Sequence, residues 1–335
     1  MLALDPRVAD AVWAAVEGHL PPRPPDTHPL GCHRRRIGDR DCFDAILIRL
    51  VTGCSWDVAA RLGKASETTL RDRRTEWLHA GVFDKLAEEA IASYDRIIGL
   101  DLSEVAVDGS LHKAPCGGEG TGPNPTDRAK SGWKWSVATD LLGIPIGWVI
   151  DAANRNDSVL LQPTLQAVAD RGLLSDVETL HLDRGYDSNL TTQRCHSLGL
   201  TDIVCAKKQP KTTGKDKSKR KRRRAHKAKT EVATTTTELL TTDAATTEPA
   251  QTPTITTEQA DTGPATNKTK TTRKKTGHSM GQRWPVERTN SWFSNFGQLR
   301  RNTDRFIPQR LSQIALAIAL ILTVKLVKWA KRWTD

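Results

Sequence analysis

The sequence predicts an α/β protein, in which a mixed β-sheet with flanking helices follows a small all-α region with a helix-turn-helix-like pattern. Residues 1–100 carry apolar residues mainly at helical spacing, whereas residues 101–208 hold short apolar runs in the order β, β, β, α, β, α, β. A wholly apolar stretch then recurs within residues 307–333, where we expect one long helix. Three early strands followed by alternating helices and strands favour a mixed sheet over an all-parallel one.

The first hundred residues predict several helices. Apolar periodicity indicates helices over residues 5–20, 41–51, 58–62 and 66–81, with Ser66 as a plausible N-cap. The last two, separated by a short turn, resemble a helix-turn-helix, and Arg71 and Arg74 share a face at i, i+3. These arginines are candidate DNA-phosphate contacts. The alternative is a small helical bundle whose arginines face water.

The strands of the second region end at acidic residues. The run 104–108 alternates and is expected to turn at Gly109, and runs 133–139 and 144–150 form a hairpin through residues 140–143. A helix should begin at Asn156-Asp157, a strand over 178–182 ends at Asp183, and a helix over 188–198 precedes Gly199. A last strand is expected over 201–206.

A Lys- and Thr-rich segment interrupts this pattern over residues 209–282. Thirteen Lys or Arg residues fall between Lys207 and Lys229, and no aromatic residue occurs between Tyr186 and Trp284. Such a composition predicts disorder, because too little apolar area can be buried to offset chain entropy. The run KSKRKRRR is either a solvated linker or a nonspecific clamp on DNA phosphates.

We therefore expect four regions. Residues 1–100 form a helical domain with the candidate DNA contacts, and residues 101–208 form the first part of the α/β domain. Residues 209–282 form an insertion whose composition predicts disorder, and residues 283–335 form the C-terminal helical part of the α/β domain.

Charge and cysteine content narrow the class of protein. The chain has 50 Lys or Arg against 39 Asp or Glu, a formal net charge of +11, which favours polyanionic partners and nucleic acid first. Six cysteines form no CxxC pair, which argues against a zinc ribbon and fits reduced thiols in the cytoplasm. No basic segment precedes an apolar stretch at the start, and the apolar run 314–322 is short for a bilayer, so we expect neither secretion nor a membrane.

Three acidic residues are candidates for one metal site. Asp108 and Asp183 each follow an apolar strand, and Glu287 lies on a predicted helix with Arg283 one turn before it. Neighbouring strand ends would bring the two aspartates together. Converging carboxylates are the ligands that Mg²⁺ prefers, and two such ions promote phosphodiester cleavage.

Each acid also has a structural interpretation. Asp108 before Gly109 is typical of a turn, Asp183 is placed to cap the following turn, and Glu287 could be a surface acid paired with Arg283. Asp187 competes with Asp183, although its place before Ser188 indicates an N-cap. The fit of three acids to one nuclease topology favours the metal site.

The motifs resemble those of bacterial insertion-sequence DDE transposases of the IS-four-like and IS-five-like group. The matching stretches are Gly53-Cys-Ser-Trp56 with WLHAGVF, then VDGSLHKA, WKWSVATDLLGIPI, LHLDRGYDS and RWPVERTNSWFSNFGQLRRNTDR. They cover about residues 1–208 and 278–333, and the last stretch is the most specific.

The resemblance implies a ribonuclease-H-like catalytic fold with Asp108, Asp183 and Glu287 as catalytic metal ligands for Mg²⁺ or Mn²⁺. It implies that water and then a DNA 3′-hydroxyl attack phosphodiesters in double-stranded DNA, at terminal inverted repeats and at the target. A homodimer on DNA is expected, because two element ends must be handled. The alternative hypotheses are a non-catalytic or domesticated DNA-binding protein and a plain metal-dependent nuclease.

The chain departs from the family's Tyr-Arg-Glu-Lys signature around the last acid. Arg283 and Glu287 match, whereas Met280 and Ser294 occupy the Tyr and Lys positions. Other cations and one aromatic residue remain candidates for contacting DNA, stacking on unpaired bases in the case of the aromatic residue. These are Lys130, Lys134, Arg184, Arg283, Trp292, Arg300 and Arg301.

Overall fold

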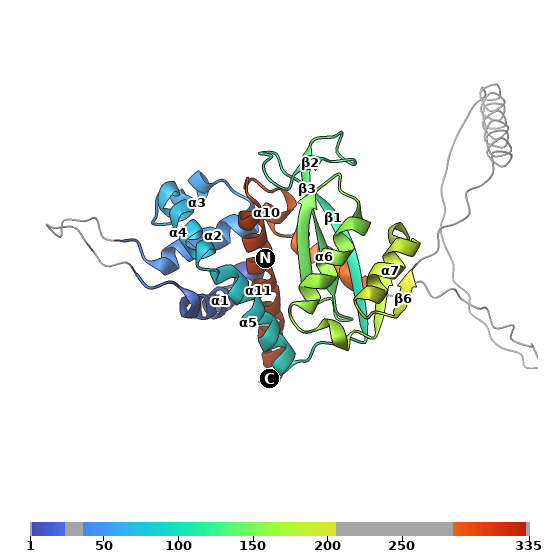
Figure 1. Ribbon diagram of the computed structural model, residues 1–335. Coiled ribbons are helices and arrows are strands. Elements are labelled where there is room, and N and C mark those ends of the chain that lie inside the picture. Colours follow the sequence, from blue (N-terminus) through green and yellow to red (C-terminus); the bar gives the residue numbers. More distant parts are fainter. Residues whose placement is uncertain (1, 24–35, 206–283, 333–335) are drawn as a thin grey trace, which may run out of the picture. The chain divides into compact units, whose positions relative to one another are not determined.

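The computed structural model describes residues 2–23, 36–205 and 284–332. The Lys- and Thr-rich segment 209–282, predicted to be disordered, lies outside the described residues, as does Arg283. Figure 1 shows the described elements in chain order.

In the described part of residues 1–100, five α-helices follow a short 3₁₀ turn. They are α1 (Pro6–His19), α2 (Asp39–Thr52), α3 (Trp56–Leu62), α4 (Glu67–His79) and α5 (Val82–Ile97). Asp5 caps α1, and Ser66 caps α4 by accepting from the Thr69 amide at 3.2 Å, as its sequence predicted. The helix-turn-helix-like pair corresponds to α3 and α4.

The sheet occupies the middle of the chain. Its strands are β1 (Glu104–Lys113), β2 (Gly122–Pro123), β3 (Ser131–Thr139), β4 (Pro145–Ala152), β5 (Thr179–Leu182) and β6 (Asp202–Cys205). β3 pairs antiparallel with both β1 and β4, whereas β5 is parallel to β1 and β6 is parallel to β5. The predicted mixed sheet is confirmed, with the short β2 added beside β3.

Helices cover both faces of this sheet (Figure 1). One face packs against α6 (Asp157–Ala169) and α7 (Asn189–Ser197), through Val105, Val107, Leu180 and Leu182 of the strands. The other face, which includes Trp133, Trp135 and Val137, packs against α9 (Trp284–Ser294) and shares its core with α10 (Gly297–Arg300) and α11 (Ile307–Lys331).

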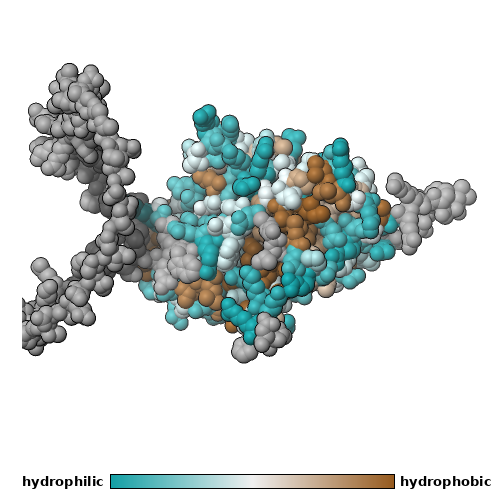
Figure 2. Space-filling model, turned by 180° about the vertical axis from the view of Figure 1, so that it is seen from behind, coloured by the Kyte–Doolittle hydropathy of each residue, from teal (hydrophilic) through white to brown (hydrophobic). Residues whose placement is uncertain are grey.

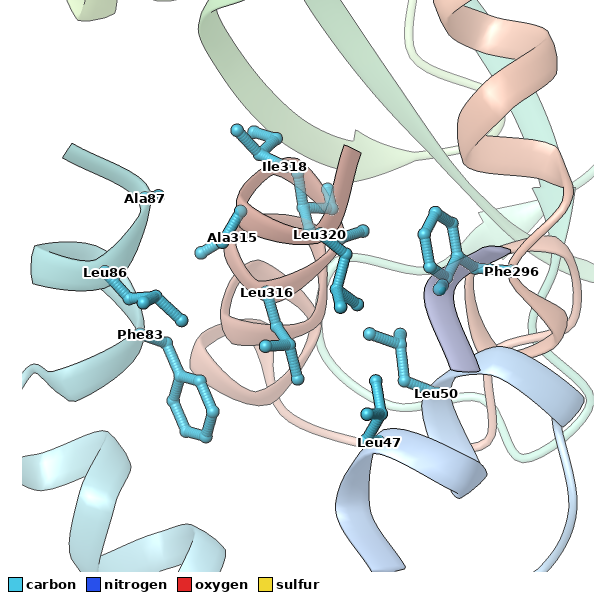
Figure 3. Close-up of a cluster of buried hydrophobic side chains, with 14 of the residues drawn as sticks. Leu47, Leu50, Phe83, Leu86, Ala87, Phe296, Ala315, Leu316, Ile318 and Leu320 are labelled. Carbon is cyan, nitrogen blue, oxygen red and sulfur yellow. The ribbon is translucent and has the colours of Figure 1, made fainter. Parts of the chain in front are cut away.

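α11 is the centre of the larger core. Figure 3 shows Ala315, Leu316, Ile318 and Leu320 of α11 between residues of α2, α5 and the segment before α10. The first hundred residues therefore bury their apolar faces against the last long helix of the chain, and α1 and α5 both contact it.

By length and composition alone, α11 could cross a membrane, and 56% of its apolar window is buried inside the protein. Core helices pass the same test, and residues 314–320 of α11 are all fully or almost fully buried.

On the opposite view of the molecule, apolar surface gathers in the middle and hydrophilic side chains border it above and below (Figure 2).

A buried polar network ties α2 and α4 to the loop before α11. Asp304 accepts from Arg49 of α2 at 3.2 Å and from Arg74 of α4 at 2.6 Å, and it also accepts from Gln313 of α11. Both guanidinium groups lie over the Trp56 ring, 4.2 and 4.8 Å from its centroid. Burial lowers the pKa of Arg49 to about 10, and Asp304 opposes this shift.

Local capping differs from the sequence prediction at two positions. Asn156, not Asp157, caps α6, and its side chain accepts from the Ser158 amide at 3.0 Å. Ser188, not Asp187, caps α7. Gly199 follows the C-cap of α7 with φ of +86°, the left-handed conformation that its position predicted.

Candidate active site

Asp108 and Asp183 lie side by side on neighbouring parallel strands. The register pairs Ala106 with His181 and Val107 with Leu182. Asp108 is the next residue of β1, and Asp183 is the first residue after β5. Adjacent strands are about 5 Å apart, so the two aspartates occupy neighbouring positions. Of the two predicted strand ends, only the one before Asp183 is present, because β5 ends at Leu182 whereas β1 continues to Lys113.

The two aspartates also share a face of the sheet. Side chains alternate between faces along extended chain, and the backbone of Asp183 is still extended, with φ of −74° and ψ of 163°. Val107 and Leu182 belong to the cluster under α6 and α7, so the residues after them point to the opposite face, where α9 lies.

The predicted turn at Gly109 is wrong, because β1 continues to Lys113. What ends near Asp108 is the pairing with β5, whereas the pairing with β3 runs on from Asp108–Val137 to Lys113–Gly132. Gly109 is required for a different reason: a Cβ atom there would lie 2.5 Å from Oδ1 of Asp157, at the start of α6.

Asp183 adopts the capping role that its sequence position allowed. Its carboxylate accepts from the Arg184 amide at 2.6 Å and so opens the 3₁₀ turn Arg184–Tyr186. Its backbone carbonyl accepts from the Cys205 thiol at 3.3 Å, which fixes the turn to β6. The bond to Arg184 holds the carboxyl group by one oxygen and orients it at the end of β5.

Asn290 of α9 is held against Asp108. Its Nδ2 donates to Oδ2 of Asp108 at 3.3 Å, and its Oδ1 accepts from the Trp135 indole at 2.8 Å. The indole can only donate, so the amide must turn its oxygen to Trp135 and its NH₂ to the carboxylate. Trp135 is itself fixed, because it stacks on His112 at 3.6 Å and meets Phe293 edge-on at 5.6 Å.

Glu287 lies one helical turn before Asn290, on the same helix above the aspartates, and its side chain is exposed. Among the described residues, no group of three His, Cys, Asp or Glu side chains is close enough to hold a metal ion. The donor chemistry nevertheless fits Mg²⁺ or Mn²⁺, since all three candidate ligands offer carboxylate oxygens.

Two predicted DNA contacts are buried and paired inside the protein. Lys134 donates to Asp157 Oδ1 and to the Arg155 carbonyl, both at 2.7 Å, and its side chain is 5% exposed. Arg74 is held by Asp304. The expectation that these two side chains face solvent is therefore wrong, because each is needed to neutralise an acid from a distant part of the chain.

The other predicted contacts are accessible to different degrees. Arg184, Lys130, Arg300 and Arg301 are exposed. Arg71 is also exposed, and its Nε donates to Glu67 at 2.9 Å.

Trp292 borders a separate cleft of about 650 Å³ with residues of α5 and α11. Arg288 lies 4.9 Å from the centroid of the Trp292 ring and Lys325 lies 4.2 Å from it, so two cations already contact the ring. A base that stacked on this ring would have to share it with them.

Sequence reasoning missed Asn290 and His112 as residues near Asp108. Helical spacing from Glu287 was the only available signal for Asn290. His112 follows Asp108 by four residues, which places both on one face of β1, but nothing in the sequence predicted its stacking. Burial lowers the pKa of His112 to about 3, so the ring is neutral near pH 7.

The strand order, with parallel β1, β5 and β6, antiparallel β3 and β4, and helices on both faces, is that of a ribonuclease-H-like fold. Residues 99–322 match the family described as "Transposase DDE domain", and residues 8–87 match "Putative transposase of IS4/5 family". The chain belongs to the DDE transposases of bacterial insertion sequences. Domains of this family generally depend on divalent metal ions.

Two curated relatives come from Burkholderia cepacia. A "Putative transposase for insertion sequence element IS402" is 34% identical over 99 residues, which are 28% of this chain and 47% of that protein. An "Insertion element IS402 uncharacterized 16.2 kDa protein" is 33% identical over 121 residues, which are 36% of this chain and 82% of that protein. The chain thus spans about half of the first relative.

One solved structure, a "Mos1 transposase paired-end complex with left transposon end", is 12% identical and covers 53% of this chain and 61% of its own. Its TM-score is 0.21, too low to transfer any structural detail.

Proposed function

We propose that this protein cleaves double-stranded DNA at the ends of an insertion sequence and joins the ends to target DNA. The observation that carries the proposal is the β1–β5 register, which puts Asp108 and Asp183 at neighbouring positions on the face covered by α9. Membership of the DDE transposase family supports the same activity.

Asp108, Asp183 and Glu287 are the proposed catalytic metal ligands. A bound pair of Mg²⁺ or Mn²⁺ ions would supply an activated oxygen nucleophile and neutralise charge on the transferring phosphate. Because Glu287 is exposed and outside any three-acid group, the proposal requires α9 to bring it closer when metal and DNA bind.

Asn290 is a proposed positioning residue. Its amide donates to Asp108 while Trp135 fixes its orientation, so it sets how α9 lies over β1. Glu287 is one turn away on the same rigid helix, and its distance from Asp108 therefore depends on this contact.

The proposed DNA contacts are the exposed cations Arg71, Lys130, Arg184, Arg300 and Arg301, which would position the backbone without reading sequence. Residues 1–100 are proposed to contribute DNA binding and residues 101–208 with 283–335 to contribute catalysis. A homodimer in the cytoplasm is proposed, because one transposition event acts on two element ends.

The test is a cleavage and strand-transfer assay on labelled DNA that carries the inverted repeats flanking the gene. We expect Mg²⁺-dependent nicks at the repeat ends and joined products, both abolished by EDTA and by Asp183→Asn. The matched control is Asp187→Asn, an acid in the same loop that is expected to leave both products intact. Binding without cleavage in every protein would contradict the proposed metal site and favour a non-catalytic DNA binder.

A further inference from the structure

A basic cleft lies at the far end of β1 from the metal-site aspartates. It encloses about 520 Å³ and is lined by His112 and Lys113 of β1, residues of the 124–127 loop, and Arg300 and Arg301. Three cations face one acid here, since Lys113 pairs with Asp127 at 3.3 Å. Neither Arg300 nor Arg301 has an ion pair with any residue that the structure describes, and both are exposed.

The cleft is aligned with the aspartates by β1 itself. Asp108, Ser110 and His112 lie on one face of the strand, and His112 Nε2 and Ser110 Oγ are 2.8 Å apart. Lys113 is five positions after Asp108 along β1, which is roughly 17 Å at strand spacing. The pairing of β1 with β5 ends at Val107. Further along β1, Lys113 forms an isolated parallel β-bridge with Arg301.

The backbone that carries the two arginines is anchored independently of their side chains. The Asn302 amide donates to the Lys113 carbonyl at 2.8 Å, and the buried Asn302 side chain donates to Gln313 at 2.7 Å. The backbone at both arginines is thus fixed, while neither guanidinium group is paired with an acid among the described residues. Such groups suit a phosphodiester, whose oxygens accept bidentate bonds from arginine.

We propose that this cleft binds a phosphate of the DNA strand being processed, within about five nucleotides of the scissile bond, as judged by the ~3.4 Å rise per nucleotide. This inference rests on the proposed function. Arg300 and Arg301 hold the backbone, and the exposed end of β1 guides the strand toward Asp108. The cleft therefore fixes the register of the DNA end relative to the metal site.

The first experiment measures DNA affinity against salt for the full chain, between about 50 and 200 mM NaCl. Arg300→Gln/Arg301→Gln is expected to reduce the magnitude of the slope of log K against log[salt] by up to about 2, one for each lost phosphate contact. The control, Lys85→Gln/Arg96→Gln, removes the same charge from α5 and is expected to change it much less. Equal slopes for the two variants would overturn the proposal.

The second experiment steps a single neutral methylphosphonate linkage along the duplex end. We expect one position within the five-nucleotide span to weaken wild-type binding but not binding by the Arg300→Gln/Arg301→Gln variant. An equal loss of binding at every linkage position, in the wild type and the variant alike, would overturn the assignment. Weakening by inorganic phosphate beyond NaCl of equal ionic strength, with no sensitive linkage, would indicate a free-phosphate site and would also overturn it.

The two binding experiments can fail independently of the cleavage assay. Binding slopes and linkage effects need no cleavage, so they are expected to hold in Asp183→Asn as well. Unchanged thermal unfolding of the arginine variant, which keeps the backbone anchors at Asn302, would confirm that it is folded.

Discussion

Replacing Asp304 by alanine should destabilise the protein more than any single surface change. Asp304 is the acid between Arg49 and Arg74, and all three side chains are nearly inaccessible to water. Removing the carboxylate leaves two guanidinium groups buried beside each other over Trp56. Their mutual repulsion is already visible, because Arg74 contributes to lowering the pKa of Arg49.

The expected loss is large relative to total stability. Breaking a buried ion pair by removing one partner costs about 3–5 kcal/mol, and here one acid serves two cations. A domain is typically stable by about 5–15 kcal/mol, so Asp304→Ala should remove about a fifth of the total or more. Asp304→Asn keeps volume and one acceptor oxygen, so it should cost less than Asp304→Ala.

Urea unfolding followed by tryptophan fluorescence would measure both losses. The exposed pair Asp57–Arg61 provides the control, since Asp57→Ala should change stability by less than about 1 kcal/mol. If Asp304→Ala does not fold, Asp304→Asn and Arg74→Met, each alone and then combined, give the coupling energy between the two positions. A loss below about 1 kcal/mol for Asp304→Ala, or no coupling, would refute the reasoning.

Three further changes test the site and its surroundings. Asn290→Ala should lower strand cleavage and raise the Mg²⁺ concentration needed for half-maximal rate, because Asp108 loses its donor; Ser291→Ala is the control, and equal effects of the two would contradict the role. Gly109→Ala should lower cleavage and cost about 1–3 kcal/mol, because its Cβ displaces Asp157; unchanged thermal unfolding would show that the space is available. Burial raises the pKa of Asp140 from 3.8 to about 6, so the folded state binds the extra proton, and stability should fall by roughly 2 kcal/mol as pH rises from 4 to 6. Urea unfolding of Asp140→Asn over this range should show a flatter pH dependence, and an unchanged slope would contradict the assignment.

The fold was predictable to the level of element order. Periodicity located the strands on both sides of residues 140–143, and Ser66 and Gly199 marked helix ends because their chemistry is local. The extension of β1 beyond Gly109 was not predictable. A glycine usually indicates a turn, and here it instead makes room for Asp157, 48 positions later, as only tertiary structure reveals.

The neighbouring placement of Asp108 and Asp183 on the sheet could be predicted from the sequence, whereas the partners of the buried cations could not. The two acids stand out because each follows an apolar run, although each also fits a turn or cap. Lys134 and Arg74 have the same appearance as any surface cation in the sequence, and only Asp157 and Asp304 decide that they are buried. Asn290 was missed because its role depends on the Trp135 indole from a different strand.

The central place of α11 has a consequence for synthesis of the protein on the ribosome. Helices α1 and α5 bury apolar surface against α11, and 209 residues lie between the end of α5 at Ile97 and the start of α11 at Ile307. At about 5–20 residues per second, the first helices are exposed for roughly 10–40 s before their partner is made. The chain should therefore depend on holding factors during translation, and a transcript cut short before α11 should yield only aggregating or degraded fragments.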